Sequence, residues 1–201
     1  MKNLAPTDVP INQVVRERWS PRAFSDQAVT PEVLRNLFEA ARWAPSSSNL
    51  QPWAYIVATK DDQENFDKVL GTLVEFNAGW AQHAPVLAIS IAQIKNPKDG
   101  ASNRHAFHDV GSASAQLTLQ AVSQGLLVHQ MAGFDPNSAR ETFNIPADWE
   151  AVAAMAIGYD GDPASLSEKL RERELAPRSR KPLAEFVITG EWGHTASFVA
   201  K

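Results

Sequence analysis

Two arginines flank a hydroxyl near the start of the chain, in a pattern that suits an anionic ligand. Arg18 and Arg22 stand on either side of Ser20 and Pro21, so both guanidinium groups belong to one turn. A guanidinium can form two parallel hydrogen bonds with a phosphate, and a serine hydroxyl can add a neutral one. Taken alone, the same residues also fit a solvated helix end, where cations interact favourably with the last carbonyls.

Two further segments carry polar or basic side chains that could share such a ligand. The loop from Pro45 to Pro52 is uncharged and rich in hydroxyl and amide groups. Such groups suit a polar heterocycle and sugar-like hydroxyls better than they suit proton transfer. Near the other end of the chain, Arg178, Arg180 and Lys181 form a basic run. An ordinary turn and a solvated charged surface are the alternative interpretations of these two segments.

A metal site is the main rival chemistry. His105 and His108 are three residues apart and Asp109 follows, so two imidazoles and a carboxylate could lie on one face of a helix. At the start of a helix such residues are more often caps and surface groups, and a metal would need ligands from elsewhere. His83 and His129 could contribute, but no spacing in the sequence brings them together.

Composition excludes several classes of protein function. The 201 residues fit a single domain, 1–201, and 19 basic against 23 acidic residues argue against a broad nucleic-acid-binding surface. The sequence has no cysteine, which excludes disulfides and thiol chemistry within it, and it has no G-x-S-x-G motif of a serine hydrolase. No segment approaches the ~18 apolar residues of a membrane span, and the N-terminus lacks a signal-peptide core. We therefore expect a cytoplasmic protein that binds neither nucleic acid nor membranes.

The elements that must position these residues alternate imperfectly between helix and strand, without a Gly-rich strand-to-helix turn. This pattern favours an α+β fold in which helices flank a sheet. Apolar and β-branched runs predict strands at 53–59, 85–92 and 151–159, and a strand-like stretch follows Pro182. Periodicity and caps predict helices at 11–18, from Thr30 to before Pro45, at 61–82, at 104–125, from Asp135, and at 165–175 behind a Ser165/Glu168 capping box.

In this order and spacing the segments resemble the signatures of the nitroreductase family. The similarity extends over about residues 11–190 and implies a central, mainly antiparallel sheet flanked by helices, with the C-terminal segment exchanged in a homodimer. The matching segments are Arg18–Phe24, Ala44–Asn49 with Gln51–Trp53, Asp109–Leu126, Gln130–Phe134 and Arg178–Leu183.

The resemblance also implies an FMN whose phosphate and ribityl chain are held by the first and last segments. Trp19 contributes mainly through its backbone, and it stands where many family members have a second basic residue. The residues that inherit phosphate and ribityl roles are Arg18, Ser20, Arg22, Arg178 and Arg180.

The other flavin contacts implied by the resemblance come from the middle of the chain. Pro45, Ser46 and Ser47 reach the flavin across the dimer interface, and Asn49 faces its ring. A backbone loop of Met131, Ala132 and Gly133 approaches the ring, where a residue without Cβ permits close contact, and Asn77 matches a further contact through a loose alignment.

The implied activity is hydride transfer from NADH or NADPH through FMN to a small organic acceptor, such as a nitroaromatic or a quinone, in alternating half-reactions. The cofactor carries the chemistry, so no catalytic side chain and no metal ligand are assigned. Two alternatives stay open: a metal-dependent enzyme using His105, His108 and Asp109, and a flavin-binding protein without turnover. The segment 96–108 is a candidate substrate lid or an ordinary surface loop.

Overall fold

The computed structural model describes residues 3–199, so the two residues at each end of the predicted 1–201 domain lie outside the described residues. A four-stranded sheet in the order β1-β2-β4-β3 forms the centre, and each neighbouring pair is antiparallel. This confirms the expected α+β fold with a mainly antiparallel sheet. The strands are β1 (Trp53–Thr59), β2 (Val86–Gln93), β3 (Leu126–Met131) and β4 (Trp149–Tyr159).

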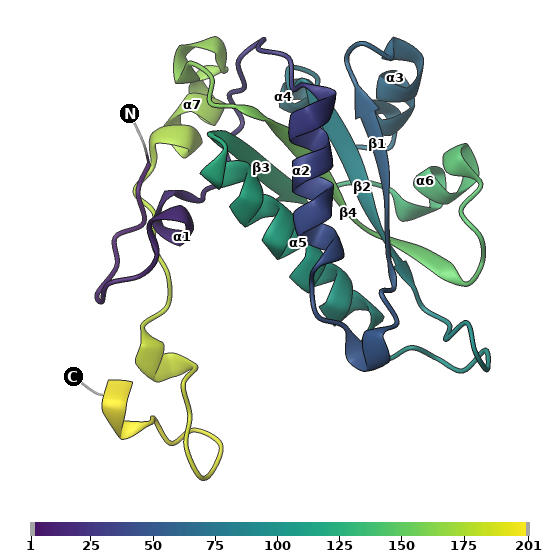
Figure 1. Ribbon diagram of the computed structural model, residues 1–201. Coiled ribbons are helices and arrows are strands. Elements are labelled where there is room, and N and C mark those ends of the chain that lie inside the picture. Colours follow the sequence, from purple (N-terminus) through teal and green to yellow (C-terminus); the bar gives the residue numbers. More distant parts are fainter. Residues whose placement is uncertain (1–2, 200–201) are drawn as a thin grey trace.

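Helices cover both faces of the sheet. Figure 1 shows α2 and α5 crossing one face, where Leu37 and Leu117 pack against alternate residues of the strands. On the opposite face α3, α4 and α6 enclose a second core around Phe66 and Trp80. The inner strand β2 contributes side chains to both cores, which explains its continuous apolar run. The helices are α1 (Gln13–Glu17), α2 (Pro31–Arg42), α3 (Gln63–Gly71), α4 (Glu75–Ala81), α5 (Ala106–Ser123), α6 (Pro136–Phe143) and α7 (Glu168–Leu175).

The stretch predicted to be helical, 61–82, holds two helices, α3 and α4, separated by a short break. Between them the Val74 amide donates to the Gly133 carbonyl at 3.2 Å, and the Asp135 amide donates to the Thr72 carbonyl at 2.8 Å. The backbone at 72–74 therefore pairs with the loop that follows β3 instead of continuing the helix. Tertiary hydrogen bonding overrides a helical periodicity here.

Two predictions near the C-terminus are wrong. Ser165 does not open a helix, because it lies in a 3-10 turn where its hydroxyl donates to the Asp162 carbonyl at 2.7 Å, and α7 begins only at Glu168. The strand-like stretch after Pro182 forms a 3-10 turn at Leu183–Glu185 and, farther on, an isolated bridge at 188 and 195. It joins no sheet within residues 3–199.

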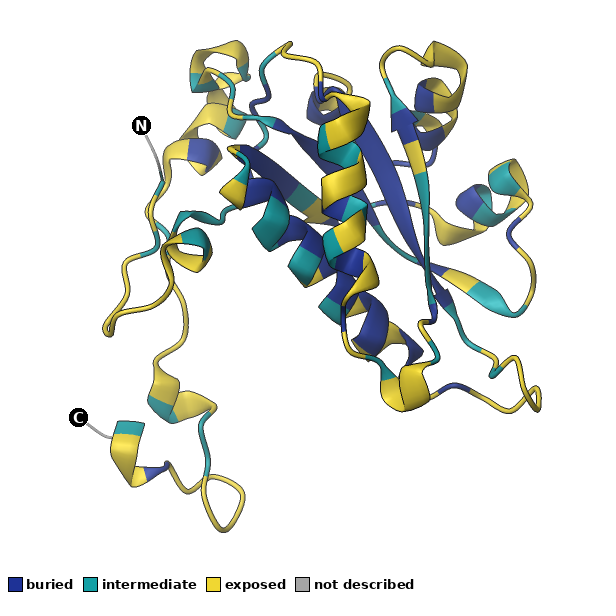
Figure 2. Ribbon diagram, in the orientation of Figure 1, coloured by how far each residue is buried: buried dark blue, intermediate teal, exposed yellow. Residues whose placement is uncertain are grey.

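An arm of residues 182–199 extends away from the sheet and its helices (Figure 1), and most of its residues are exposed (Figure 2). Its aromatic side chains include Phe186, Trp192 and Phe198, which are 58%, 93% and 83% exposed. Large aromatic side chains left exposed in this way are available for contact with another molecule. The predicted exchange of this arm between two subunits stays a prediction.

Candidate functional site

The basic turn, residues 18–22, is attached to the end of β4. Directly after it, Phe24 forms an antiparallel bridge with Asp160, and the Gly161 amide donates to the Ala23 carbonyl at 3.1 Å. A Cβ on Gly161 would lie 2.5 Å from the carbonyl carbon of Phe24, so only a glycine allows the two backbones to approach this closely. The sheet thus fixes where the turn lies.

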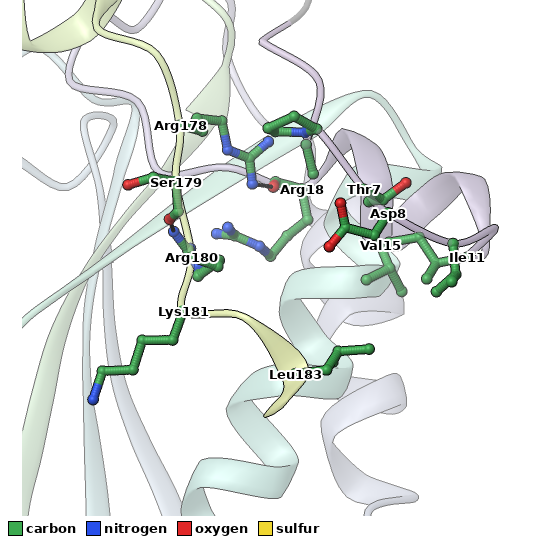
Figure 3. Close-up of a pocket in the computed structure, with 13 residues that line it drawn as sticks. Thr7, Asp8, Ile11, Val15, Arg18, Arg178, Ser179, Arg180, Lys181 and Leu183 are labelled. Carbon is green, nitrogen blue, oxygen red and sulfur yellow. Dashed lines mark hydrogen bonds between the residues drawn. The ribbon is translucent and has the colours of Figure 1, made fainter. Parts of the chain in front are cut away.

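The basic run after α7 packs against this turn. Arg178 donates through Nη2 to the carbonyl of Arg18 and through Nη1 to the carbonyl of Asn3, both at 2.7 Å. Arg178 and Arg18 are 160 residues apart in the chain. Figure 3 shows the side chains of Arg18, Arg178 and Arg180 beside one another, with Arg180 Nη1 donating to the Ser179 carbonyl at 2.7 Å, while Lys181 points away from them. The fold therefore brings together the first and last of the three segments.

Burial and mutual repulsion both act on these arginines. Burial lowers the pKa of Arg18 below its usual range, and the charge of Arg180 lowers it further. The pKa of Arg178 is lowered first by burial and then by the charges of Arg18 and Arg180. Because guanidinium groups stay charged near neutral pH, an anion bound among them would relieve their repulsion. The cluster has the chemistry of a phosphate site.

Three adjoining cavities share Arg18, with volumes of about 370, 310 and 250 Å³. The largest has a basic wall from the run after α7 and an apolar wall that includes Ile11 and Leu183. The second adds Trp19, Ser20 and Arg22 of the basic turn. The third is a mainly apolar slot lined by Val15, Ser20, Ala115, Thr118, Leu119, Val128 and Gln130. Apolar walls with a few polar groups are typical of small-ligand sites.

Arg22 is engaged by a carboxylate that the sequence did not point to. Its Nη1 lies 3.6 Å from Oε2 of Glu174, whose side chain is only 1% exposed. Oε1 of Glu174 accepts the backbone amides of Arg22 and Ala23 at 2.7 and 3.0 Å. The charge of Arg22 is thus largely offset within the protein. A second carboxylate, Asp8, lines the largest cavity.

His129, considered from the sequence only as a possible metal ligand, instead supports the basic turn from the sheet. Its Nδ1 lies 2.8 Å from the carbonyl of Pro21, and its ring centroid lies 4.6 Å from that of Trp80. Burial lowers the pKa of His129 to about 4, with smaller contributions from Arg22 and Arg18 in the same direction. The imidazole is neutral near pH 7, and Nδ1–H is the group that donates to Pro21.

The hydroxyl-rich loop lies elsewhere in this chain. Its Ser47 amide donates to Oδ2 of Asp109 at 3.0 Å, which ties the loop to the first turn of α5. The slot beside Arg18 contacts α5 from Ala115 onward, six residues or about 9 Å farther along the helix at 1.5 Å per residue, and none of the three cavities that share Arg18 is lined by the loop. Pro45, Ser46 and Ser47 therefore do not reach the arginine cluster of their own chain. Ser48, Asn49 and Gln51 have φ of 52°, 53° and 51°, and such left-handed backbone in non-glycine residues often marks functional loops.

The residues at and after the end of β3 that were predicted to contact the flavin differ in their exposure. Met131 ends β3 with its side chain in the core against α3 and α4, so only its backbone is available to a ligand, whereas Ala132 is exposed. Asn77 Nδ2 donates to the Gly133 carbonyl at 3.0 Å, and a Cβ on Gly133 would lie 2.4 Å from that same nitrogen. Asn77 fills the space that a side chain at position 133 would occupy. This packing explains the glycine without the close approach to a ligand that was inferred from the sequence.

The geometry gives the rival metal site no support. His108 Nδ1 lies 3.2 Å from Oδ1 of Asp109, and the other oxygen of Asp109 is occupied by the Ser47 amide. Within residues 3–199, no three His, Asp or Glu side chains are grouped as metal ligands would be. Over the same residues no helix is both long enough and apolar enough to cross a membrane.

Comparison with known proteins decides the family. The sequence model of the Nitroreductase family matches residues 15–159. The chain belongs to the nitroreductase family. A solved structure described as an oxidoreductase containing FMN is 33% identical in sequence, with a TM-score of 0.90 over 97% of this chain and 98% of its own.

Two other relatives of the family are more distant. A nitroreductase family protein from Clostridium difficile 630 is 25% identical, with a TM-score of 0.69 over 90% of this chain and 99% of its own. A protein of Stenotrophomonas maltophilia, provisionally named NADH dehydrogenase/NAD(P)H nitroreductase, is 27% identical over 80% of this chain and 89% of its own. The matches extend well beyond the individual motifs.

Proposed function

We propose that this nitroreductase family member is an FMN-dependent oxidoreductase that passes a hydride from NADH or NADPH to a small organic acceptor such as a nitroaromatic or a quinone. The observation that carries the proposal is the cluster of Arg18, Arg178 and Arg180 around one group of cavities. When bound, FMN supplies the hydride-accepting and hydride-donating centre. The protein's part is to bind and orient it and to leave room for two ligands in turn.

The residues beside the arginine cluster fit such a cofactor. Three cations with Ser20 make a donor set for a dianionic phosphate, and Arg18 already lies 3.3 Å from the Ser20 hydroxyl. The neighbouring slot has apolar walls and polar groups at Thr118 and Gln130, which are 3.3 Å apart, as a flat polar heterocycle requires. The residues assigned to the cofactor are Arg18, Trp19, Ser20, Arg22, Asn77, Met131, Ala132, Gly133, Arg178 and Arg180.

The remaining contacts, from Pro45, Ser46, Ser47 and Asn49, are proposed to come from a second subunit. Two observations support this: the loop is distant from its own arginine cluster, and the exposed aromatic arm has no core of its own. The homodimer is tested by sedimentation with FMN present, where twice the 22.0 kDa chain mass is expected. A flavin-loaded monomer would contradict the shared site.

The cofactor claim is tested with purified protein and one charge variant. The wild type should be yellow, release FMN on denaturation, and lose its flavin absorbance when mixed anaerobically with NADH or NADPH. Arg18→Ala should weaken FMN binding by about ten- to a hundredfold, the worth of a hydrogen bond to a charged group. Arg35→Ala, an exposed arginine on α2, is the matched control and should bind normally.

Two outcomes would count against the proposal. A colourless protein that cannot be reconstituted with FMN would exclude the cofactor. A flavin that binds but is not bleached by either nicotinamide would identify a binding protein without turnover. With bleaching established, steady-state reduction of nitroaromatics and quinones names the acceptor class.

A further inference from the structure

Glu174 is buried in a helix whose other side chains are exposed, apart from the half-buried Leu170. It is the buried residue of α7, whose sequence EKLREREL is almost wholly charged. Its side chain is 1% exposed, and Oε2 has no hydrogen-bond partner among the described residues, only the 3.6 Å contact with Arg22. A carboxylate is costly to bury unless it is paired and hydrogen-bonded, so this placement needs a reason.

The contacts of Glu174 are directed at the backbone of the basic turn. Oε1 accepts the amides of Arg22 and Ala23 at 2.7 and 3.0 Å. Four residues farther on, Arg178 donates to the carbonyl of Arg18 at 2.7 Å. The short segment from Glu174 to Arg178 therefore holds both ends of the basic turn. Glu174 accepts the amides at its end, and Arg178 donates to the carbonyl at its start.

We propose that Glu174 is a positioning residue of the anion site. It holds the basic turn in the conformation in which Arg18 and Ser20 face the arginines at 178 and 180, and it offsets the charge of Arg22. Glu174 borders the second cavity, but its oxygens are turned toward the turn and Arg22, so it acts through them and not on the ligand. The identity of the ligand as FMN rests on the proposed function, whereas the role of Glu174 in holding the basic turn at the anion site does not.

The test separates the phosphate from the rest of the flavin. FMN, riboflavin, which lacks the phosphate, and inorganic phosphate are titrated into the full-length wild type, Glu174→Ala, Glu174→Gln and Glu172→Ala. Flavin binding is followed by fluorescence and phosphate binding by thermal shift. Glu172 is an exposed glutamate of the same helix and serves as the matched control.

Glu174→Ala is expected to weaken FMN binding by about tenfold, because two buried amides lose their acceptor and the turn relaxes. Phosphate binding should weaken in parallel while riboflavin affinity is unchanged. Glu174→Gln keeps an acceptor oxygen and should recover most of the FMN affinity, and Glu172→Ala should match the wild type. If the alanine variant does not fold, Glu174→Asp, too short to reach both amides, should show the FMN loss that glutamine does not.

Equal losses of FMN and riboflavin affinity would overturn the inference, since a general loss of structure would explain them. Unchanged FMN and phosphate binding in Glu174→Ala would overturn it as well. A wild type that binds phosphate but no flavin would refute the proposed function alone, and the phosphate titration would then decide the role of Glu174.

Discussion

His129 makes the stability of this protein depend on pH in a calculable way. In the folded chain burial lowers its pKa to about 4, against 6.5 for an ordinary histidine. As the pH falls below 6.5 the unfolded chain takes up a proton that the folded chain refuses until about pH 4. The free energy of unfolding therefore has its full value above pH 6.5 and decreases as the pH falls from 6.5 to about 4. At 1.36 kcal/mol per pKa unit the loss is about 3 kcal/mol.

Urea unfolding at pH 7, 6, 5 and 4 measures this loss, with His129→Gln as the perturbed protein at the same protein and flavin concentrations. Glutamine does not titrate, so the free energy of unfolding of this variant should fall less than that of the wild type by about 3 kcal/mol over the range. His83→Gln, at an exposed histidine, should follow the wild type. Identical pH profiles for wild type and His129→Gln would refute the reasoning.

Two further predictions concern Gly133 and the hydroxyl-rich loop. Gly133→Ala should lower the free energy of unfolding by about 1–3 kcal/mol, because the new Cβ displaces the Asn77 amide, whereas Gly71→Ala, with nothing within 4 Å, should not destabilise. Urea midpoints compare the two, and equal midpoints would contradict the crowding at Gly133. Asp109→Ala removes the acceptor of the Ser47 amide and should speed hydrogen exchange in the hydroxyl-rich loop. An unchanged exchange rate there would show that the bond does not order the loop.

Local signals were sufficient for the elements with strong start, stop or burial patterns. Thr30 caps α2 through the Val33 amide and is followed by Pro31, as the sequence indicated. The apolar run of β2 is a fully covered strand, and the long helix predicted at 104–125 is α5. These patterns act within a few residues of chain, so they can be read without the tertiary structure.

The errors lie where distant backbone decides local structure. The stretch predicted to be helical, 61–82, is divided because its middle pairs with the loop after β3. β3 itself was not predicted, since its apolar run Leu126–Val128 directly follows the long helix and is interrupted by His129 and Gln130. The arm after Pro182 has strand-like residues but no strand to pair with in residues 3–199.

By itself the sequence determined the family resemblance, the α+β class and the residue types of an anion site, because motifs and periodicities are properties of neighbouring residues. Only the tertiary structure decided which of those residues meet. Arg18 and Arg178 come together across 160 residues because the basic turn and the chain after α7 both pack at the end of β4. The same packing buries Glu174, and the hydroxyl-rich loop is bonded to Asp109, about 9 Å along α5 from the nearest slot residue of that helix, Ala115; no local pattern encodes either arrangement.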